Sequence, residues 1–199
     1  MTVRAVLFDL GDTLWHFPEM PPINLIRAET VRRISDLLRT WGIDPEGELF
    51  FLGRTLFPDV IPTLGWLRER DYRIGSVTNR ALGGEPFRQE LCHYGLLDYF
   101  EVLSISCDVG YMKPHAAIFQ HALEALAVAP AEAVMVGDSL RADVAGAQAL
   151  GMTAVWKRDH SSDDEERPLT LPDGQGPVVV IPDYTIETLG DLPGLAIFA

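Results

Sequence analysis

The stretch Val6-Leu7-Phe8-Asp9-Leu10-Gly11-Asp12-Thr13-Leu14 decides the fold of this chain. Its apolar start runs directly into two carboxylates and a threonine. A short apolar run that ends in polar residues is typical of a strand buried on both faces of a parallel sheet. Packing alone does not require two acidic side chains beside such a strand. The loop after the strand is therefore also a candidate functional site.

Similar apolar runs recur along the chain and alternate with helical patterns. They lie at residues 3–10, 73–77, 102–105, 133–136 and 153–156, and a sixth follows at 178–181. This alternation favours an α/β fold with a doubly wound parallel sheet. Ligands of such sheets bind beyond the carboxyl ends of the strands, near the point where the strand order reverses. Polar motifs at these ends are therefore expected to converge.

Helix positions follow from apolar spacing and from capping residues. Apolar residues at helical spacing over 118–126 predict a helix with one buried face. Asp59 is expected to cap the N-terminus of a helix that carries Leu64. Asp143 is expected in the first turn of a helix that ends near Gly151, where its charge suits the helix dipole.

The domain organisation predicted from these patterns is one core with one insertion. Residues 1–15 and 58–199 are expected to form the α/β core. Residues 16–57 separate the first strand from the helix before the second strand, and they contain an amphipathic helix over 24–41. We expect this segment to be a small helical cap insertion.

Composition narrows the class of partner. The net charge of −13 opposes binding to nucleic acid or anionic lipid, both of which require clustered Lys and Arg. No apolar run approaches the roughly 20 residues that cross a bilayer, and the N-terminus leads into a strand without an export signal. Cys92 and Cys107 are too few for a disulfide framework, which fits a cytoplasmic setting. A small substrate is expected, with no nucleic-acid or membrane partner, and the oligomeric state stays open.

Three further polar motifs follow other expected strands. They are Thr78-Asn79, Lys113-Pro114, and Gly137-Asp138-Ser139 with Asp143. With the Asp9 loop, this set resembles the haloacid dehalogenase superfamily of aspartate-nucleophile hydrolases, in its phosphatase-like branch. The resemblance implies a Rossmann-like core and a Mg²⁺-dependent phosphomonoester hydrolase that acts on a small phosphorylated metabolite. The identity of that substrate stays open.

The resemblance also implies a role for each acidic residue. Asp9 would attack phosphorus and form an aspartyl-phosphate. Mg²⁺, which prefers oxygen ligands, would be held by Asp9, Asp138 and the Gly11 carbonyl, with Asp143 in or beside the coordination sphere. Structural alternatives exist for these carboxylates, as caps or turn residues.

The phosphoryl group needs donors and a cation aimed at its oxygens. By resemblance these are the Thr78 hydroxyl and the Lys113 ammonium, with help from Asn79. Thr13 is expected to hydrogen-bond within the Asp9 loop. Arg80 could contact a substrate anion, although surface arginines are common.

One position departs from the family pattern. Phosphatases of this superfamily usually carry a second aspartate two residues after the nucleophile, as the general acid and base. That position is Gly11 here, and Asp12 comes one residue later. Three outcomes stay open: Asp12 substitutes, the leaving group needs no protonation, or turnover is feeble.

Other functions fit the sequence less well or differ in class. Dehalogenases of the superfamily work without Mg²⁺, so Asp138 with Asp143 argues against them. Phosphonate cleavage needs a cap lysine, and no lysine precedes Lys113. A weakly active or non-catalytic regulatory module that binds phosphate and Mg²⁺ is kept open by Gly11.

Overall fold

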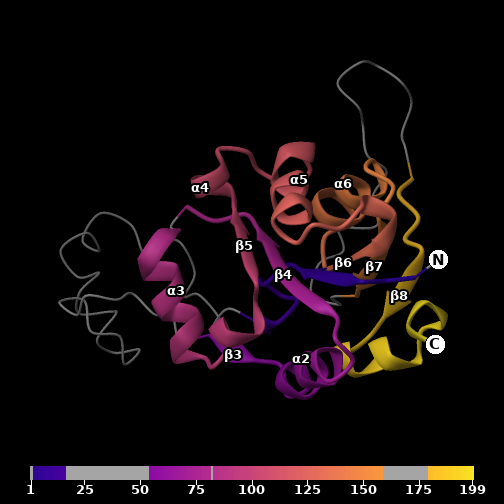
Figure 1. Cartoon of the computed structure of the whole chain (residues 1–199), viewed down its shortest axis with the longest axis horizontal. Helices are drawn as coiled ribbons and strands as arrows, with labels where there is room; N and C mark the ends of the chain where they lie inside the picture. Colours follow the sequence, from indigo (N-terminus) through magenta and orange to yellow (C-terminus); the bar gives the residue numbers. More distant parts are fainter. Residues whose placement is uncertain (1, 17–53, 82, 159–178) are drawn as a thin grey trace, which may run out of the picture.

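The computed structural model describes residues 2–16, 54–81, 83–158 and 179–199. Its centre is a six-stranded sheet in the order β5-β4-β1-β6-β7-β8, and every neighbouring pair is parallel (Figure 1). The strands are β1 (Ala5–Phe8), β4 (Arg73–Thr78), β5 (Val102–Ile105), β6 (Ala133–Gly137), β7 (Thr153–Lys157) and β8 (Tyr184–Ile186). The chain builds β4 and β5 on one side of β1 and then returns to place β6 on the other side. The predicted doubly wound parallel fold is confirmed, and β1 with β6 marks the point where the strand order reverses.

Both faces of the sheet are buried, which explains the apolar runs. In β1, Val6 and Phe8 pack in one apolar cluster, whereas Ala5 and Leu7 pack in the other. This division follows from the alternation of side chains along a strand. The sheet is therefore a central layer between two apolar layers.

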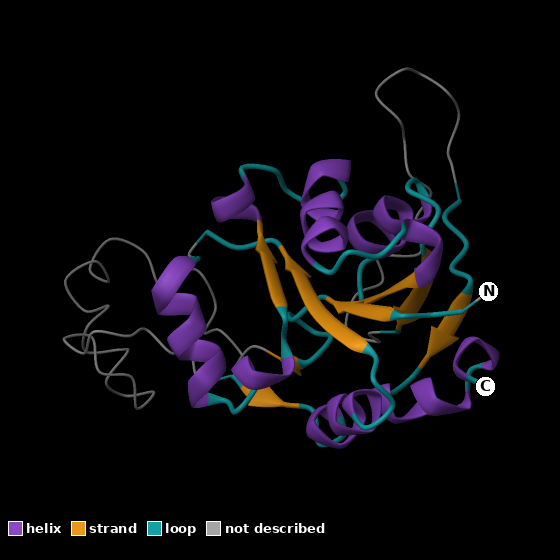
Figure 2. Cartoon of the chain, viewed as in Figure 1, coloured by secondary structure: helices purple, strands orange, loops and turns teal. Residues whose placement is uncertain are grey.

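Helices cover the two faces of the sheet (Figures 1 and 2). The ones at one face are α5 (Ala116–Ala125) and α6 (Ala145–Gln148), while α2 (Val60–Arg68) lies at the opposite face. The helix α3 (Gly84–His93) stands at the β5 edge, and α4 (Ser106–Val109) follows β5. A π-helical turn, η4 (Leu140–Val144), precedes α6, and the 3₁₀ turns are η2 (Leu97–Tyr99), η3 (Pro130–Glu132), η5 (Leu189–Gly194) and η6 (Ala196–Phe198). No described helix is long and apolar enough to span a membrane.

One prediction about local structure was wrong, and a second was confirmed in position but not in its hydrogen bond. The sixth strand is Tyr184–Ile186, and the described part of the predicted run 178–181, residues 179–181, is not a strand. Ile186 packs in the core, whereas Val179 and Ile181 are exposed. Asp59 does occupy the N-cap position of α2, but its side chain makes no capping hydrogen bond. Asp59 Oδ2 instead accepts a hydrogen bond from the Gly190 amide at 2.9 Å.

The ends of the predicted insertion lie side by side. The strand β2 (Trp15–His16) pairs antiparallel with β3 (Thr55–Leu56), so the chain leaves and re-enters the core at one place. The predicted cap helix over 24–41 lies outside the described residues. The prediction that residues 16–57 form a helical cap therefore stays a prediction.

Candidate active site

All eight residues predicted for the site line one cavity of about 210 Å³ at the carboxyl ends of the strands. These eight are Asp9, Gly11, Asp12, Thr78, Asn79, Lys113, Asp138 and Asp143. The expected convergence is therefore confirmed as geometry. It arises because β4, β1 and β6 are neighbours, so their carboxyl ends meet at one edge.

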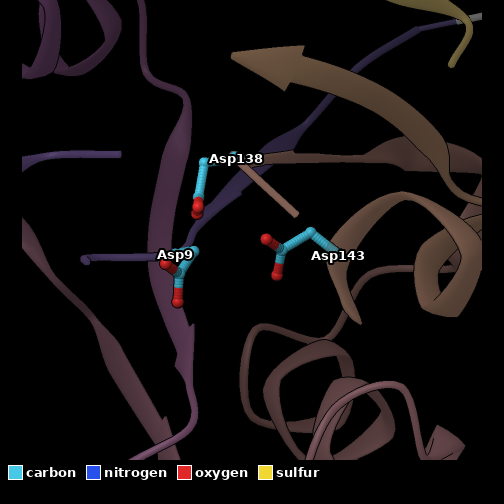
Figure 3. Close-up of side chains that lie close together, drawn as sticks. All are labelled: Asp9, Asp138 and Asp143. Carbon is cyan, nitrogen blue, oxygen red and sulfur yellow. The ribbon is translucent and has the colours of Figure 1, made fainter. Parts of the chain in front are cut away.

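Three carboxylates that line the cavity lie close together (Figure 3). Asp9 follows β1, Asp138 follows β6, and Asp143 comes from the π-helical turn η4. One oxygen of each lies within 4.8 Å of the others. Asp143 also approaches the Gly137 backbone so closely that a side-chain carbon at Gly137 would lie 2.3 Å from its carboxylate. Glycine at 137 is thus a requirement of the cluster.

Burial and crowding shift the pKa values in this cluster. Burial, reinforced by the charges of Asp9 and Asp143, raises the pKa of Asp138 to about 8. Burial also raises the pKa of Asp143 to about 6, although Lys113 opposes the shift. The donor set is all oxygen and holds more negative charge than one lysine neutralises. These residues fit Mg²⁺, which binds carboxylate oxygens and would relieve the repulsion.

Lys113 joins two of the carboxylates from the loop after α4. Its Nζ lies 2.5 Å from Asp9 Oδ1 and 2.7 Å from Asp143 Oδ1, and the side chain is buried. Burial alone would lower the pKa of Lys113, but the charges of Asp143 and Asp9 outweigh it and raise the pKa. Lys113 is therefore a fixed cation beside Asp9.

Asn79 positions Lys113 through the backbone. Its Oδ1 accepts from the Lys113 amide at 2.7 Å, and its Nδ2 donates to the Lys113 carbonyl at 3.2 Å. Both polar atoms of the Asn79 side chain therefore bond to the Lys113 backbone. The contact between Asn79 and substrate stays a prediction. Thr78 is buried at the end of β4, beside this pair.

The Asp9 loop is held by contacts that reach across the sheet. The Thr13 hydroxyl donates to Asp138 Oδ1 at 3.2 Å, so its partner lies outside the loop, contrary to expectation. Asp12 has a φ of 53°, a left-handed conformation that few non-glycine residues adopt. Lys157 Nζ donates to the Asp12 carbonyl at 2.8 Å and stabilises this turn. Gly11 and Asp12 both line the cavity, so Asp12 is within the site despite its shift by one residue.

Sequence reasoning missed an ion-pair network at the wall of the cavity. Arg54 and Arg80 both line the cavity, and Glu90 of α3 joins them. Arg54 Nε lies 2.5 Å from Glu90 Oε1, and Arg80 Nη2 lies 2.6 Å from Glu90 Oε2. Arg54 falls within the segment predicted as cap, and Glu90 lies in a helix without a motif. No local pattern marks these residues as partners.

Comparisons of the sequence with known proteins point to one family. A family model described as a haloacid dehalogenase-like hydrolase matches residues 27–151. The chain is 33% identical to a glyceraldehyde 3-phosphate phosphatase of Methanopyrus kandleri, over 82% of this chain and 88% of the relative. It is also 40% identical to a phosphoserine phosphatase of Thermus thermophilus, in an alignment that covers 55% of this chain and 44% of that relative.

A solved structure shares the fold of this chain. The crystal structure of a haloacid dehalogenase superfamily phosphatase from Thermococcus onnurineus superposes with a TM-score of 0.67 at 32% identity. The superposition covers 96% of this chain and 97% of the other. The family match, these relatives and the cavity around Asp9 together show that this chain belongs to the haloacid dehalogenase-like hydrolases, in their phosphatase-like branch.

Proposed function

We propose that this protein is a Mg²⁺-dependent phosphomonoester hydrolase that acts through an aspartyl-phosphate on Asp9. The observation that carries the proposal is the position of Asp9 at the junction of the acidic cluster and Lys113. A carboxylate that attacks a phosphate ester needs positive charge beside it, because both reactants are anionic. Lys113 supplies one such charge.

The acidic cluster of Asp9, Asp138 and Asp143 supports a metal role for this side of the cavity. Asp9, Asp138 and the Gly11 carbonyl would hold Mg²⁺, with Asp143 as a further ligand or as a support for the others. Bound there, Mg²⁺ supplies charge neutralisation and orientation for the phosphoryl oxygens. Thr78 and Lys113 would bind the same oxygens, and Asn79 would keep Lys113 in place.

The reaction divides into two displacements at phosphorus. In the first, an Asp9 oxygen bonds to phosphorus, the bond to the ester oxygen breaks, and the departing alcohol oxygen takes a proton. In the second, water bonds to phosphorus and gives up a proton, and inorganic phosphate leaves as the Asp9 carboxylate is regenerated. Asp12 is the carboxyl group in the cavity that we assign to both proton transfers, since Gly11 has none.

The relatives support a small substrate. Their names specify glyceraldehyde 3-phosphate and phosphoserine, which are phosphate monoesters of three-carbon compounds. A cavity of about 210 Å³ suits a ligand of that size. We further propose that residues 16–57 form a cap that contacts the alcohol portion of the substrate.

The test is phosphate release from p-nitrophenyl phosphate and from a panel of small phosphate esters, with Mg²⁺ and with EDTA. We expect release that requires Mg²⁺ and disappears in Asp9→Asn, while Asp98→Asn, an exposed aspartate outside the cavity, retains it. If Asp12 is the acid and base, Asp12→Asn should lose about 10²- to 10⁴-fold in rate. Mg²⁺ binding without release from any ester would instead support a regulatory module, the function that Gly11 leaves open.

A further inference from the structure

We propose that Arg80 forms a second anion-binding subsite, which selects small phosphomonoesters that carry another negative group near the scissile phosphate. This inference rests on the proposed phosphatase function and adds the substrate class to it. The second group is a carboxylate or a second phosphate, since a guanidinium binds the anionic oxygens of either.

The fold places Arg80 next to the phosphoryl-binding residues. Arg80 follows Thr78 by two residues, so their Cα atoms are at most about 7 Å apart. Both residues line the same cavity as Lys113. A ligand with phosphate at Thr78 and Lys113 therefore needs only a short carbon chain to bring a second anion to Arg80.

The Arg80 backbone is anchored before any ligand binds. The Ser106 hydroxyl accepts from the Arg80 amide at 2.9 Å and donates to the Arg80 carbonyl at 3.0 Å. Ser106 is buried at the start of α4. A guanidinium on such an anchored backbone loses little conformational entropy when it binds an anion.

The side chain is also held in place, with donors left over. Its guanidinium carbon lies 4.4 Å from the centre of the Phe87 ring, and its Nη2 donates to Glu90 Oε2 at 2.6 Å. Among the described residues, Glu90 is the one side chain to which this guanidinium donates a hydrogen bond. Arginine has five N–H donors, so most of them remain for a ligand at the cavity wall.

Charge favours an anion at this place. Glu90 divides its two oxygens between Arg54 and Arg80, so it neutralises Arg80 only in part. Burial, which outweighs the opposing effect of Glu90, lowers the pKa of Arg80. A desolvated cation of this kind gains more from an incoming anion than a solvated one does. The carboxylates that line the cavity follow β1 and β6, whereas Arg80 follows β4, so the second anion would bind on the side away from the acidic cluster.

The test compares substrates that differ in one group. 3-Phosphoglycerate and glycerol 3-phosphate share a three-carbon chain and a scissile monoester, but only the former carries a carboxylate. We expect kcat/KM to favour 3-phosphoglycerate by about ten- to hundredfold, the worth of one hydrogen-bonded charge pair. Propane-1,3-diol bisphosphate against propyl phosphate tests a second phosphate in the same way, and the larger preference identifies the group.

Variants separate recognition from structure. Arg80→Gln should bring the kcat/KM ratio close to one, and Arg80→Lys should keep part of it. Arg73→Gln is the matched control, because Arg73 begins β4 at the end away from the cavity and pairs with the partly exposed Glu101. If Arg80 only anchors α3, Arg80→Gln lowers kcat/KM for both esters and the melting temperature, while the ratio stays unchanged. That result would overturn the proposal, as would a wild-type ratio near one for both substrate pairs.

Equilibrium binding keeps this test independent of turnover. The probes are 3-phosphonopropionate and propylphosphonate, which contain no hydrolysable ester. We expect the wild-type protein to bind the former about tenfold or more tightly, and Arg80→Gln to lose that difference. Should no ester be hydrolysed, the proposed function fails, yet the Kd ratio still decides for or against the subsite.

Discussion

The cavity has two sides that carry opposite charge and are built in different ways. On the side of β1 and β6, the carboxylates of Asp9, Asp138 and Asp143 face one another and repel. On the side of β4, Arg54 and Arg80 share the carboxylate of Glu90 and attract it. The acidic side therefore holds more negative charge than Lys113 neutralises, whereas on the arginine side Glu90 pairs with both guanidinium groups. We expect loss of a charge on the acidic side to reduce chemistry, and loss of the shared Glu90 carboxylate on the arginine side to reduce stability.

Removing the charge of Glu90 should give the largest effect on stability. The side chains of Arg54 and Glu90 are 2% and 5% exposed, and Glu90→Gln would leave two neighbouring guanidinium groups without their shared anion. We expect a loss of about 3–5 kcal/mol in the free energy of unfolding, measured by urea denaturation. Glu101→Gln is the control, because its pair with Arg73 is partly exposed and should cost at most about 1 kcal/mol. Equal losses of unfolding free energy in Glu90→Gln and Glu101→Gln would contradict the proposed structural role of the Glu90 network.

On the acidic side, Lys113→Met should reduce activity strongly while it leaves the nucleophile Asp9 in place. The substitution removes the cation that pairs with Asp9 and Asp143, at similar side-chain length. We expect kcat to fall by about 10²- to 10³-fold, the usual cost of removing one donor to a transition-state oxyanion. Steady-state kinetics with p-nitrophenyl phosphate, alongside circular dichroism to confirm folding, measures it. Activity within a fewfold of wild type would contradict the role of Lys113.

Lys157 should have a smaller effect, because it acts through the backbone. Its Nζ donates to the Asp12 carbonyl and lies 3.9 Å from the centre of the Phe57 ring. Lys157→Met should lower kcat by about tenfold, the order of one charged hydrogen bond, with little change in KM. A fall in melting temperature with kcat unchanged would show that Lys157 stabilises the fold without positioning Asp12.

The acidic side also predicts a pH dependence of stability without divalent ions. Carboxyl groups of an unfolded chain titrate near about pH 3.9, whereas Asp143 and Asp138 have pKa values of about 6 and about 8 in the folded protein. The folded state then binds more protons between these limits, so stability falls as the pH rises from about 4 to about 8. Lys113, whose pKa is raised, contributes stability that is constant over this range.

Melting temperatures in EDTA and in Mg²⁺ test this dependence. We expect a lower melting temperature at pH 8 than at pH 5 in EDTA, and a larger gain from Mg²⁺ at pH 8, because protons compete for the carboxylates. Asp138→Asn should flatten the EDTA curve, and the exposed Asp98→Asn should not. A melting temperature in EDTA that is constant across this range would show that repulsion between the carboxylates of the acidic side does not destabilise the fold.

The same contrast explains which residues could be predicted. Asp9, Thr78 and Asp138 stand at or directly after strand ends, and Lys113 lies in the loop after α4. A local pattern identifies these residues, and the parallel topology brings them together. The Arg54–Glu90 pair joins residues 36 positions apart, and no spacing rule links them. Sequence separation of this kind hides a contact, because the contact depends on how α3 packs at the β5 edge.

Apolar content alone also predicted a strand at the wrong residues. Residues 178–181 have the apolar character of a strand, yet Val179 and Ile181 are exposed. The shorter Tyr184–Ile186 pairs with β7 because it brings Ile186 to the core beside Leu189. Strand pairing at a sheet edge is decided by that packing and not by apolar content.

The sequence by itself determined the doubly wound sheet, the order of the motifs and the carboxylates of the site, because apolar period and strand-end position are local properties. Only the tertiary structure decided the partners: Asp138 for Thr13, the Lys113 backbone for Asn79, and Glu90 for Arg80. The physical reason is that a side chain's charge and hydrogen-bonding capacity are set by its type, whereas its partner is set by the packing of elements far apart in the chain.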